Sequence, residues 1–184
     1  MKKTITTLNL ILSTPAIDDY LALNDFENRN KNHLARWETI ASQSNQRRLE
    51  SWIQECVEGN SARFFIRIKE NPDTIIGLCN FTQIFRGAFQ ACYLGYKIDE
   101  EYEGKGIMFE ALRALIAYVF EELNLHRIMA NYMPSNMRSA RLLHRLGFLV
   151  EGHAKNYLLI NNKWEDHVLT ALSIEQWKSD QVPS

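Results

Sequence analysis

The chain has 184 residues, 46% of them hydrophobic, and a formal net charge of −1 at pH 7. This length suffices for one domain with a sizeable core, so we predict a single domain over residues 1–184. The near-neutral charge argues against wholesale binding to nucleic acid or to an anionic membrane, although a local basic surface is compatible with it. No apolar segment approaches the length of a membrane span, and we expect a cytoplasmic protein.

Cysteine and histidine spacing predicts neither disulfides nor a metal site. Cys56, Cys79 and Cys92 are odd in number and form no CxxC pair, which is typical of reduced thiols in a cytosolic protein. The last two lie in strand-like apolar segments, so we interpret them as inert core thiols. Four histidines also lack the spacing of metal ligands and are interpreted as structural, namely His126, His144, His153 and His167.

The N-terminal part of the chain predicts one strand and two helices. An apolar run around residues 8–12 is interrupted by polar residues, and no small-residue cleavage site follows, which favours a strand over a signal peptide. A helix is predicted to begin near Pro15, and a second runs from about Asn45 to Val57. Between them, the polar stretch Asn28 to Trp37 predicts an interruption rather than a helix.

An antiparallel meander of three strands is predicted next. Its turns are marked by Asn71-Pro72-Asp73, in which proline presets its own φ, and by Arg86-Gly87. The predicted strands are Arg63 to Lys69, Thr74 to Thr82 and Gln90 to Ile98.

Helices and strands alternate in the C-terminal half. A long helix, Ile107 to Leu123, has apolar residues at helical spacing, and a short helix capped by Ser135 or Asn136 ends before Gly147. The remaining predicted strands are Arg127 to Met133, Phe148 to Ile160 and His167 to Ile174, the last two joined at Asn161-Asn162-Lys163. The order β-α-α-β-β-β-α-β-α-β-β predicts an α/β fold with one mixed sheet.

A glycine-bearing turn joins the strand that ends at Ile98 to the long helix. It reads Glu103-Gly104-Lys105-Gly106-Ile107-Met108, and such a turn presents backbone N–H groups at the positive end of a helix dipole. This arrangement indicates a phosphate-binding site. A dinucleotide fold would place GxGxxG after the first strand, and a P-loop would require GxxxxGK followed by Ser or Thr, so the sequence argues against both.

The elements around this turn resemble those of a known family. A strand ending Tyr96-Lys97-Ile98-Asp99 precedes the turn, and Pro134-Ser135-Asn136-Met137-Arg138-Ser139 opens the short helix. Together they resemble the acetyl-CoA-dependent N-acetyltransferases of the GNAT superfamily, which implies a single GNAT domain with a mixed, mostly antiparallel sheet flanked by helices. Longer blocks resemble the branch that acetylates the N-terminal alanine of ribosomal proteins, among them Ala91 to Tyr96, Met108 to Leu112, His126 to Pro134 and Asp166 to Leu172.

The resemblance implies that acetyl-CoA is the co-substrate and that no metal takes part. The end of the strand before the turn should pair with the pantetheine arm, and a backbone N–H there should support the oxyanion of the tetrahedral intermediate. The turn should hold the pyrophosphate, although Glu103 and Met108 depart from the family pattern and a carboxylate beside phosphate is unfavourable unless it points away. The implied cofactor-binding residues are Tyr96, Lys97, Ile98, Glu103, Gly104, Lys105, Gly106, Ile107, Met108, Asn136 and Ser139.

Catalytic roles carry over from the family only in part. Ser139 matches a serine that, in the related RimL branch, lies at the CoA sulfur and is thought to protonate the leaving thiolate. The glutamate and tyrosine of the RimI branch fall on Asn131 and Leu143, and the RimL glutamate falls near Tyr157 or Leu158, so the general base is unassigned. A water chain that ends on a backbone carbonyl or on Tyr157 is a candidate. Asn131 is either part of the site or a buried hydrogen-bonding group of the fold.

The missing carboxylate base favours an α-amine as acceptor. An α-amine has a reference pKa of about 7.7–8.0 and is partly neutral at physiological pH, whereas a lysine at about 10.4 is not. The expected acceptor is therefore the N-terminal alanine of a ribosomal protein, reached by direct attack in a ternary complex. We also expect a transient ribosome contact and a monomeric or weakly dimeric enzyme. Two alternatives stay open: acetylation of another small amine, and a non-catalytic ribosome-assembly or CoA-binding module.

Three further features keep more than one interpretation. Arg138, Arg141 and Arg145 form a basic stripe that faces the CoA 3′-phosphate, RNA or solvent. Glu110 lies one turn into the long helix, where a carboxylate interacts favourably with the positive end of the helix dipole. This position favours a structural interpretation of Glu110 over a catalytic one. Trp37 is either a wall of the acceptor groove or a core residue.

Overall fold

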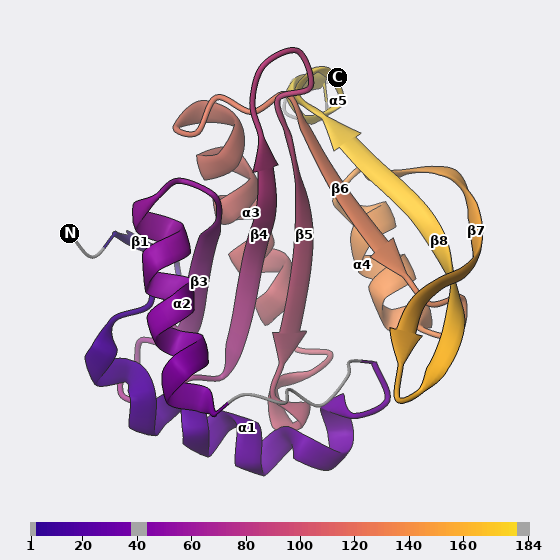
Figure 1. Cartoon of the computed structure of the whole chain (residues 1–184). Coiled ribbons are helices and arrows are strands. Elements are labelled where there is room, and N and C mark those ends of the chain that lie inside the picture. Colours follow the sequence, from indigo (N-terminus) through magenta and orange to yellow (C-terminus); the bar gives the residue numbers. More distant parts are fainter. Residues whose placement is uncertain (1–2, 38–43, 180–184) are drawn as a thin grey trace.

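The computed structural model describes residues 3–37 and 44–179, whose strands form one eight-stranded sheet with helices on both faces (Figure 1). The strands are β1 (Thr4–Thr6), β2 (Leu10–Ser13), β3 (Ala62–Ile68), β4 (Gly77–Phe85), β5 (Ala91–Ile98), β6 (Arg127–Tyr132), β7 (Leu149–Ile160) and β8 (Lys163–Ser173). The helices are η1 (Ile17–Asp19), α1 (Tyr20–Leu34), α2 (Asn45–Val57), η2 (Glu100–Tyr102), α3 (Ile107–Glu121), α4 (Met137–Arg145) and α5 (Ile174–Ser179).

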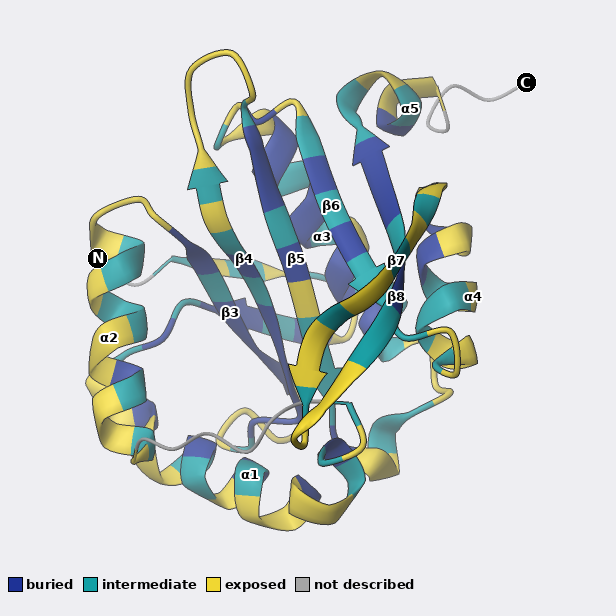
Figure 2. Cartoon of the chain, turned by 45° about the vertical axis from the view of Figure 1, so that its right-hand side comes forward, coloured by how far each residue is buried: buried dark blue, intermediate teal, exposed yellow. Residues whose placement is uncertain are grey.

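The sheet is mixed and mostly antiparallel, which confirms the predicted fold class. Its strand order is β1-β2-β3-β4-β5-β6-β8-β7, and β5 and β6 are the one pair of neighbours that run parallel among the described strands. The β7–β8 hairpin folds back so that β8 lies beside β6. Helices α1 and α2 cover one face of the sheet, and α3 and α4 cover the other (Figures 1 and 2).

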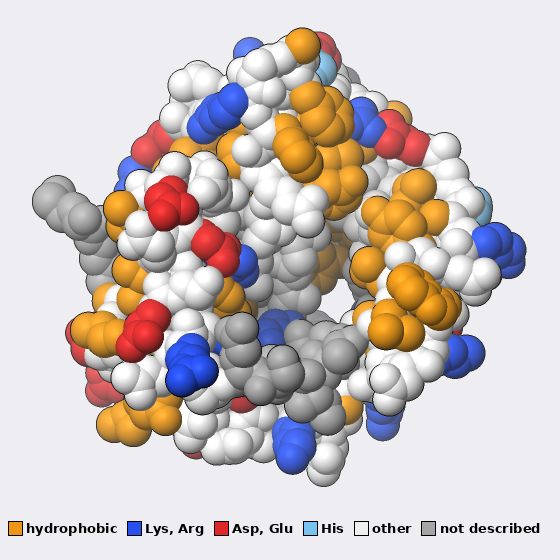
Figure 3. All heavy atoms as spheres, viewed as in Figure 1, with side chains coloured by type: hydrophobic (Ala, Val, Ile, Leu, Met, Phe, Trp, Pro, Cys, Tyr) orange, Lys and Arg blue, Asp and Glu red, His pale blue; other side chains and the backbone are white. Residues whose placement is uncertain are grey.

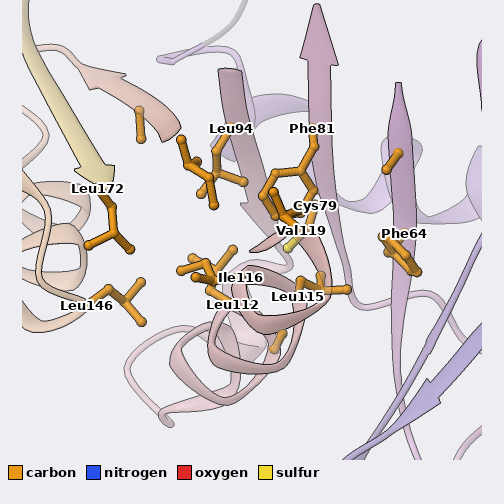
Figure 4. Packing of buried hydrophobic residues seen from close by; sticks show 14 of the residues in the cluster. Phe64, Cys79, Phe81, Leu94, Leu112, Leu115, Ile116, Val119, Leu146 and Leu172 are labelled. Carbon is orange, nitrogen blue, oxygen red and sulfur yellow. The ribbon is translucent and has the colours of Figure 1, made fainter. Parts of the chain in front are cut away.

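Two apolar layers attach the helices to the sheet. On one face, α3 turns four buried side chains toward the strands, namely Leu112, Leu115, Ile116 and Val119. They pack in one cluster with strand residues that include Phe64, Cys79, Phe81 and Leu94 (Figure 4). On the opposite face, a smaller cluster holds α1 and α2 through Leu23, Phe26, Leu34, Leu49, Phe65, Ile75 and Leu78. The sheet is therefore buried on both sides.

The prediction that the polar stretch Asn28 to Trp37 interrupts the first helix is wrong, because α1 continues through it to Leu34. Phe26, Asn30 and Leu34 are buried at helical spacing along one face of α1. The buried Asn30 amide donates to the Phe26 carbonyl at 2.9 Å, and its oxygen accepts from the Glu100 N–H at 3.0 Å. The exposed face and the buried Asn30 are polar, so the high mean polarity of the stretch concealed a helix.

Smaller differences occur toward both ends of the chain. The predicted first strand is two strands, β1 and β2, joined where the Thr7 N–H donates to the Leu10 carbonyl at 3.1 Å. β8 begins at Lys163, earlier than the predicted His167, and leads into the unpredicted α5, whose Trp177 packs against the core. No helix in the described part of the chain is long and apolar enough to cross a bilayer. Residues 3–37 and 44–179 also contain no group of three or more His, Cys, Asp or Glu placed to hold a metal ion.

The Glu110 carboxylate joins the β1–β2 turn to the first turn of α3. It accepts a hydrogen bond from Thr7 Oγ1 at 2.5 Å, and from the backbone N–H and side-chain amide of Asn9, both at 2.8 Å. Burial alone would raise the pKa of this carboxyl, but the hydrogen bonds outweigh it and hold the pKa below its usual value. These contacts give Glu110 a structural role.

We expect Glu110→Gln to lower the free energy of unfolding by about 1–2 kcal/mol at pH 7, because hydrogen bonds to a charged group are lost. Since the folded-state pKa lies below the unfolded value of 4.5, the contribution is present above that value and disappears as pH falls through the folded-state pKa. Urea titrations at pH 7 and at the lowest pH that preserves the wild-type fold measure this, with exposed Glu121→Gln as control. A difference that is equal at both pH values contradicts the expectation.

Candidate active site

β5 and β6 are paired only at their beginnings. Their parallel ladder joins Ala91 to Arg127, Cys92 to Ile128 and Tyr93 to Met129, whereas β5 continues to Ile98 and β6 to Tyr132. The two strands then diverge, as both ribbon views show (Figures 1 and 2). The opening between residues 94–98 and 130–132 is called the wedge below. The β5 edge that faces the wedge is not covered by β6.

Two cavities meet at the wedge. The α1–α2 cavity, of about 560 Å³, is bounded by α1, α2, the strands β4 to β6 and the β7–β8 hairpin. It corresponds to the hollow near the centre of the space-filling view (Figure 3). The α3–α4 cavity, of about 840 Å³, lies between the glycine turn, the start of α3 and α4. The cavities share Leu34, Trp37, Tyr96, Lys97, Asn136 and Ser139.

The glycine turn forms one end of the α3–α4 cavity. Gly104 and Gly106 have φ angles of 71° and 78°, a left-handed conformation that glycine adopts without strain, and Gly106 is the N-cap of α3. A Cβ atom at either position would meet no atom within 4 Å, so the space beside both is open. Such a turn at a helix N-terminus suits a phosphate. Lys105 is not part of the lining, and its Nζ lies 5.3 Å from the centre of the Tyr102 ring.

The Glu103 carboxylate is directed to a histidine and an arginine. One oxygen lies 3.1 Å from His33 Nε2, and the other forms an ion pair with Arg138 in the first turn of α4. This pairing offsets the unfavourable charge that the sequence places beside the expected phosphate. Arg138, Arg141 and Arg145 all line the α3–α4 cavity, so the basic stripe faces this cavity.

The other residues predicted to hold the cofactor lie along the same cavity. Ile98, Ile107 and Met108 are part of its lining, together with Tyr96 and Lys97 of β5. Met108 is also anchored in the core, where its sulfur lies 3.6 Å from Cys79 Sγ.

Ser139 lies where the two cavities meet and is held from both sides. Its backbone N–H donates to Asn136 Oδ1 at 3.1 Å, which caps α4, and its Oγ lies 2.6 Å from the Tyr96 hydroxyl. Burial raises the pKa of the Tyr96 phenol well above its ordinary value, while the bond with Ser139 acts in the opposite direction. Tyr96 therefore stays protonated at neutral pH and can donate to Ser139. The Ser139 hydroxyl is then able to donate its own proton into the wedge.

Asn131 and Tyr157 form a hydrogen-bonded pair beside β6. Asn131 Nδ2 donates to the Tyr157 hydroxyl at 3.1 Å, and Asn131 Oδ1 accepts from the Thr170 N–H at 3.4 Å. Asn131 lines the α1–α2 cavity, whereas Tyr157 lines neither cavity. Burial raises the pKa of the Tyr157 phenol, Tyr93 adds to this effect, and the bond from Asn131 opposes it. A phenolate base at Tyr157 is therefore disfavoured.

His167, which the sequence led us to interpret as structural, lines the α1–α2 cavity. It is buried, and its Nδ1 lies 3.1 Å from the carbonyl oxygen of Glu165. A proton on Nδ1 donates to that carbonyl and leaves Nε2 of the neutral ring as an acceptor. No spacing along the chain could indicate this placement, because it depends on β8 lying beside β6 in the sheet.

Three charged side chains of the α1–α2 cavity lie close to one another. Glu27 forms an ion pair with Arg48 and lies 3.6 Å from Lys97 Nζ. Glu27 is the one acidic residue of the lining within the described ranges. Trp37 lines both cavities, which favours its interpretation as a wall of the groove.

The chain is similar to N-acetyltransferases in sequence and in structure. A family model described as an acetyltransferase (GNAT) domain matches residues 9–149. The ribosomal protein uS5-alanine N-acetyltransferase of Escherichia coli is 44% identical over 182 residues, which cover 96% of this chain and 93% of that protein. A crystal structure of ribosomal-protein-S5-alanine acetyltransferase from Vibrio fischeri matches with a TM-score of 0.89 and 35% identity, over 95% of this chain and 98% of that one. Mycobacterium smegmatis RimJ in complex with CoA-disulfide matches with a TM-score of 0.80 and 27% identity, over 91% and 83%.

Proposed function

The chain belongs to the GNAT acetyltransferase family, and we propose that it transfers the acetyl group of acetyl-CoA to the N-terminal α-amine of an alanine-starting ribosomal protein in the cytoplasm. The similarity to the uS5-alanine enzymes over nearly the whole chain supports this acceptor. The observation that carries the proposal is the meeting of two cavities at Tyr96 and Ser139. Because only the α3–α4 cavity contains the glycine turn, acetyl-CoA is assigned to it and the acceptor to the α1–α2 cavity.

The α3–α4 cavity provides contacts along the length of an acetyl-CoA molecule. The left-handed turn at Gly104 and Gly106 offers backbone N–H groups to the pyrophosphate. Arg141 and Arg145 supply positive charge for the 3′-phosphate. The β5 edge at the wedge would pair with the pantetheine arm as an added strand does, and Asn136 borders its path. This course brings the thioester to Ser139.

The acceptor amine attacks the thioester directly in this arrangement. Its nitrogen bonds to the carbonyl carbon, and a backbone N–H of β5 stabilises the oxyanion that forms. When the C–S bond breaks, the Ser139 hydroxyl gives its proton to the thiolate, while Tyr96 keeps its own proton and donates a hydrogen bond to Ser139 Oγ. Solvent restores the proton of Ser139 after the products leave. The proton that the amine loses passes into the α1–α2 cavity.

The charges of the α1–α2 cavity favour an α-amine over a polyamine. A polyamine site would offer unpaired carboxylates, whereas Glu27, the one acidic residue of the described lining, is neutralised by Arg48 and lies near Lys97. A neutral α-amine followed by a peptide backbone meets no such charge requirement. The pairing of Glu27 with cationic side chains therefore argues against the alternative that the acceptor is another small amine.

Tyr157→Phe is expected to retain kcat/KM for an alanine-starting peptide within about threefold of wild type, since the role of this phenol is to hold Asn131 rather than to remove a proton. Steady-state kinetics at pH 7 measure this, with exposed Tyr20→Phe as control. A hundredfold lower kcat/KM would instead indicate that Tyr157 accepts the proton of the amine.

The experiment that tests the function offers purified protein acetyl-CoA with three acceptors. These are an alanine-starting peptide, the same peptide with a blocked α-amine and an internal lysine, and spermidine. We expect product from the first, identified by mass spectrometry as an acetylated N-terminus. Faster acetylation of spermidine would overturn the acceptor assignment. CoA binding without product from any acceptor would instead support the non-catalytic module.

A second measurement compares ribosomal protein N-termini in cells with and without the protein. At least one alanine N-terminus should lose its acetyl group in the cells that lack it. An unchanged set of ribosomal N-termini would overturn the ribosomal acceptor. Co-sedimentation of the protein with ribosomes would test the transient ribosome contact that we also propose. Sedimentation of the protein alone would test the proposed monomeric or weakly dimeric state.

A further inference from the structure

His167 is a buried imidazole in the α1–α2 cavity to which the steps above give no role. The Nδ1 position, 3.1 Å from the Glu165 carbonyl oxygen, fixes the ring through a hydrogen bond to the backbone. The described residues contribute no hydrogen bond to Nε2, and the ring borders the cavity. A neutral histidine held in this way at one nitrogen is prepared to accept a proton at the other.

The sheet places His167 beside the wedge. The β6–β8 register pairs Asn131 with Leu169, and alternation along β8 puts His167 on the same face as Asn131. β6 alone separates His167 from the wedge, and neighbouring strands lie about 4.8 Å apart. His167 lines the α1–α2 cavity together with Tyr96 and Ser139, so an amine bound in this cavity shares it with the imidazole.

The groups packed around His167 offer no competing proton acceptor within the described ranges. The Tyr157 ring lies 5.4 Å from it and keeps its phenol proton, because burial raises its pKa. Glu165 and Asp166 turn their carboxylates to lysines of the β7–β8 hairpin, at 2.7 Å in each case. Across the wedge, Glu27 is paired with Arg48 and lies near Lys97.

We propose that His167 is the general base of the acetyl transfer, an assignment that rests on the function proposed above. As the amine nitrogen bonds to the thioester carbonyl carbon, His167 Nε2 takes the proton that this nitrogen loses. The C–S bond breaks, and the thiolate receives a proton from Ser139. One proton thus leaves the amine and one reaches the sulfur. The imidazolium returns its proton to solvent through the α1–α2 cavity.

The test compares the wild type with His167→Asn, whose amide nitrogen can keep the bond to the Glu165 carbonyl. We expect kcat/KM for an alanine-starting peptide to fall about tenfold at pH 7 and to approach the wild-type value near pH 9, because an α-amine with a pKa of about 7.7–8.0 is then neutral and hydroxide takes the proton that its nitrogen loses on attack. The KM for acetyl-CoA should be unchanged. An equal loss at both pH values would overturn the assignment. His167→Gln serves the same comparison if His167→Asn does not fold.

A second readout uses His167→Ala, in which the removed ring leaves room for added imidazole. Imidazole in the assay should restore part of the lost activity, and exposed His153→Asn should match the wild type throughout. A loss that imidazole does not reduce and that persists at pH 9 would show a structural role and refute the base. A wild-type enzyme that acetylates no alanine-starting peptide would refute the proposed function, and this assignment with it.

Discussion

Replacing Ser139 with alanine is expected to lower kcat about a hundredfold, at the lower end of the range for general acids, because a thiolate leaves with only moderate assistance. The KM for acetyl-CoA should stay close to the wild-type value, since Asn136 still caps α4 through the backbone N–H of residue 139. Loss of the hydroxyl also leaves the partly buried Tyr96 phenol, 2.6 Å away in the wild type, without this partner. The reaction thereby loses the group that donates into the wedge.

Thiol release measured at saturating acetyl-CoA separates this effect from binding. Tyr96→Phe should cause a smaller loss than Ser139→Ala, because it removes the second donor of the chain and keeps the first. Ser51→Ala, at an exposed serine of α2, controls for the loss of any hydroxyl. If Ser139→Ala retains the wild-type kcat, the acid is another group.

Gly106→Val is expected to raise the Kd for acetyl-CoA about 10- to 100-fold, because a β-branched residue at a φ of 78° costs about 1–3 kcal/mol unless the turn rearranges. A rearranged turn no longer presents its N–H groups to the pyrophosphate. The new side chain also enters the open space beside the turn, where a Cβ meets no atom within 4 Å. At saturating acetyl-CoA, kcat should remain near the wild-type value.

Gly87→Val is the matched control for this substitution. Gly87 has a φ of 69° and no atom within 4 Å of an added Cβ, and it lies in the β4–β5 turn, outside the lining of both cavities. It should lower the melting temperature by a similar amount and leave the Kd unchanged. Calorimetric titration with acetyl-CoA measures the Kd of both variants, and thermal unfolding measures their melting temperatures. Equal losses of affinity in the two variants would mean that backbone strain, rather than the turn at the cavity, is responsible.

The order of elements could be predicted because most of them have local signals. Asn71-Pro72-Asp73, Arg86-Gly87 and Gly147 each mark a turn or a helix end that the structure contains. The helix through Asn30 could not be predicted, because the partner that allows this polar side chain to be buried, the Glu100 N–H, is distant in the sequence. The split between β1 and β2 depends in the same way on Glu110, which is distant in sequence.

The parts of the candidate site that lie within a single element could be predicted from the sequence. The turn from Glu103 to Met108 and the cap at Asn136 are readable from the chain, and Ser139 shares a helical face with Leu143, which is buried. The contact between Tyr96 and Ser139 joins β5 to α4 and exists only because β6 diverges from β5. His33 as a partner of Glu103 was hidden in the segment expected to be a loop.

The short β5–β6 ladder also bears on kinetics. Because the strands separate after Tyr93 and Met129, the thioester position is approached from two sides of the sheet, one for each substrate. With acetyl-CoA and the acceptor in the cavities proposed for them, we expect initial-rate kinetics of a ternary complex. The acetyl group then never needs to rest on the protein between two half-reactions, and a double-displacement rate law is not expected.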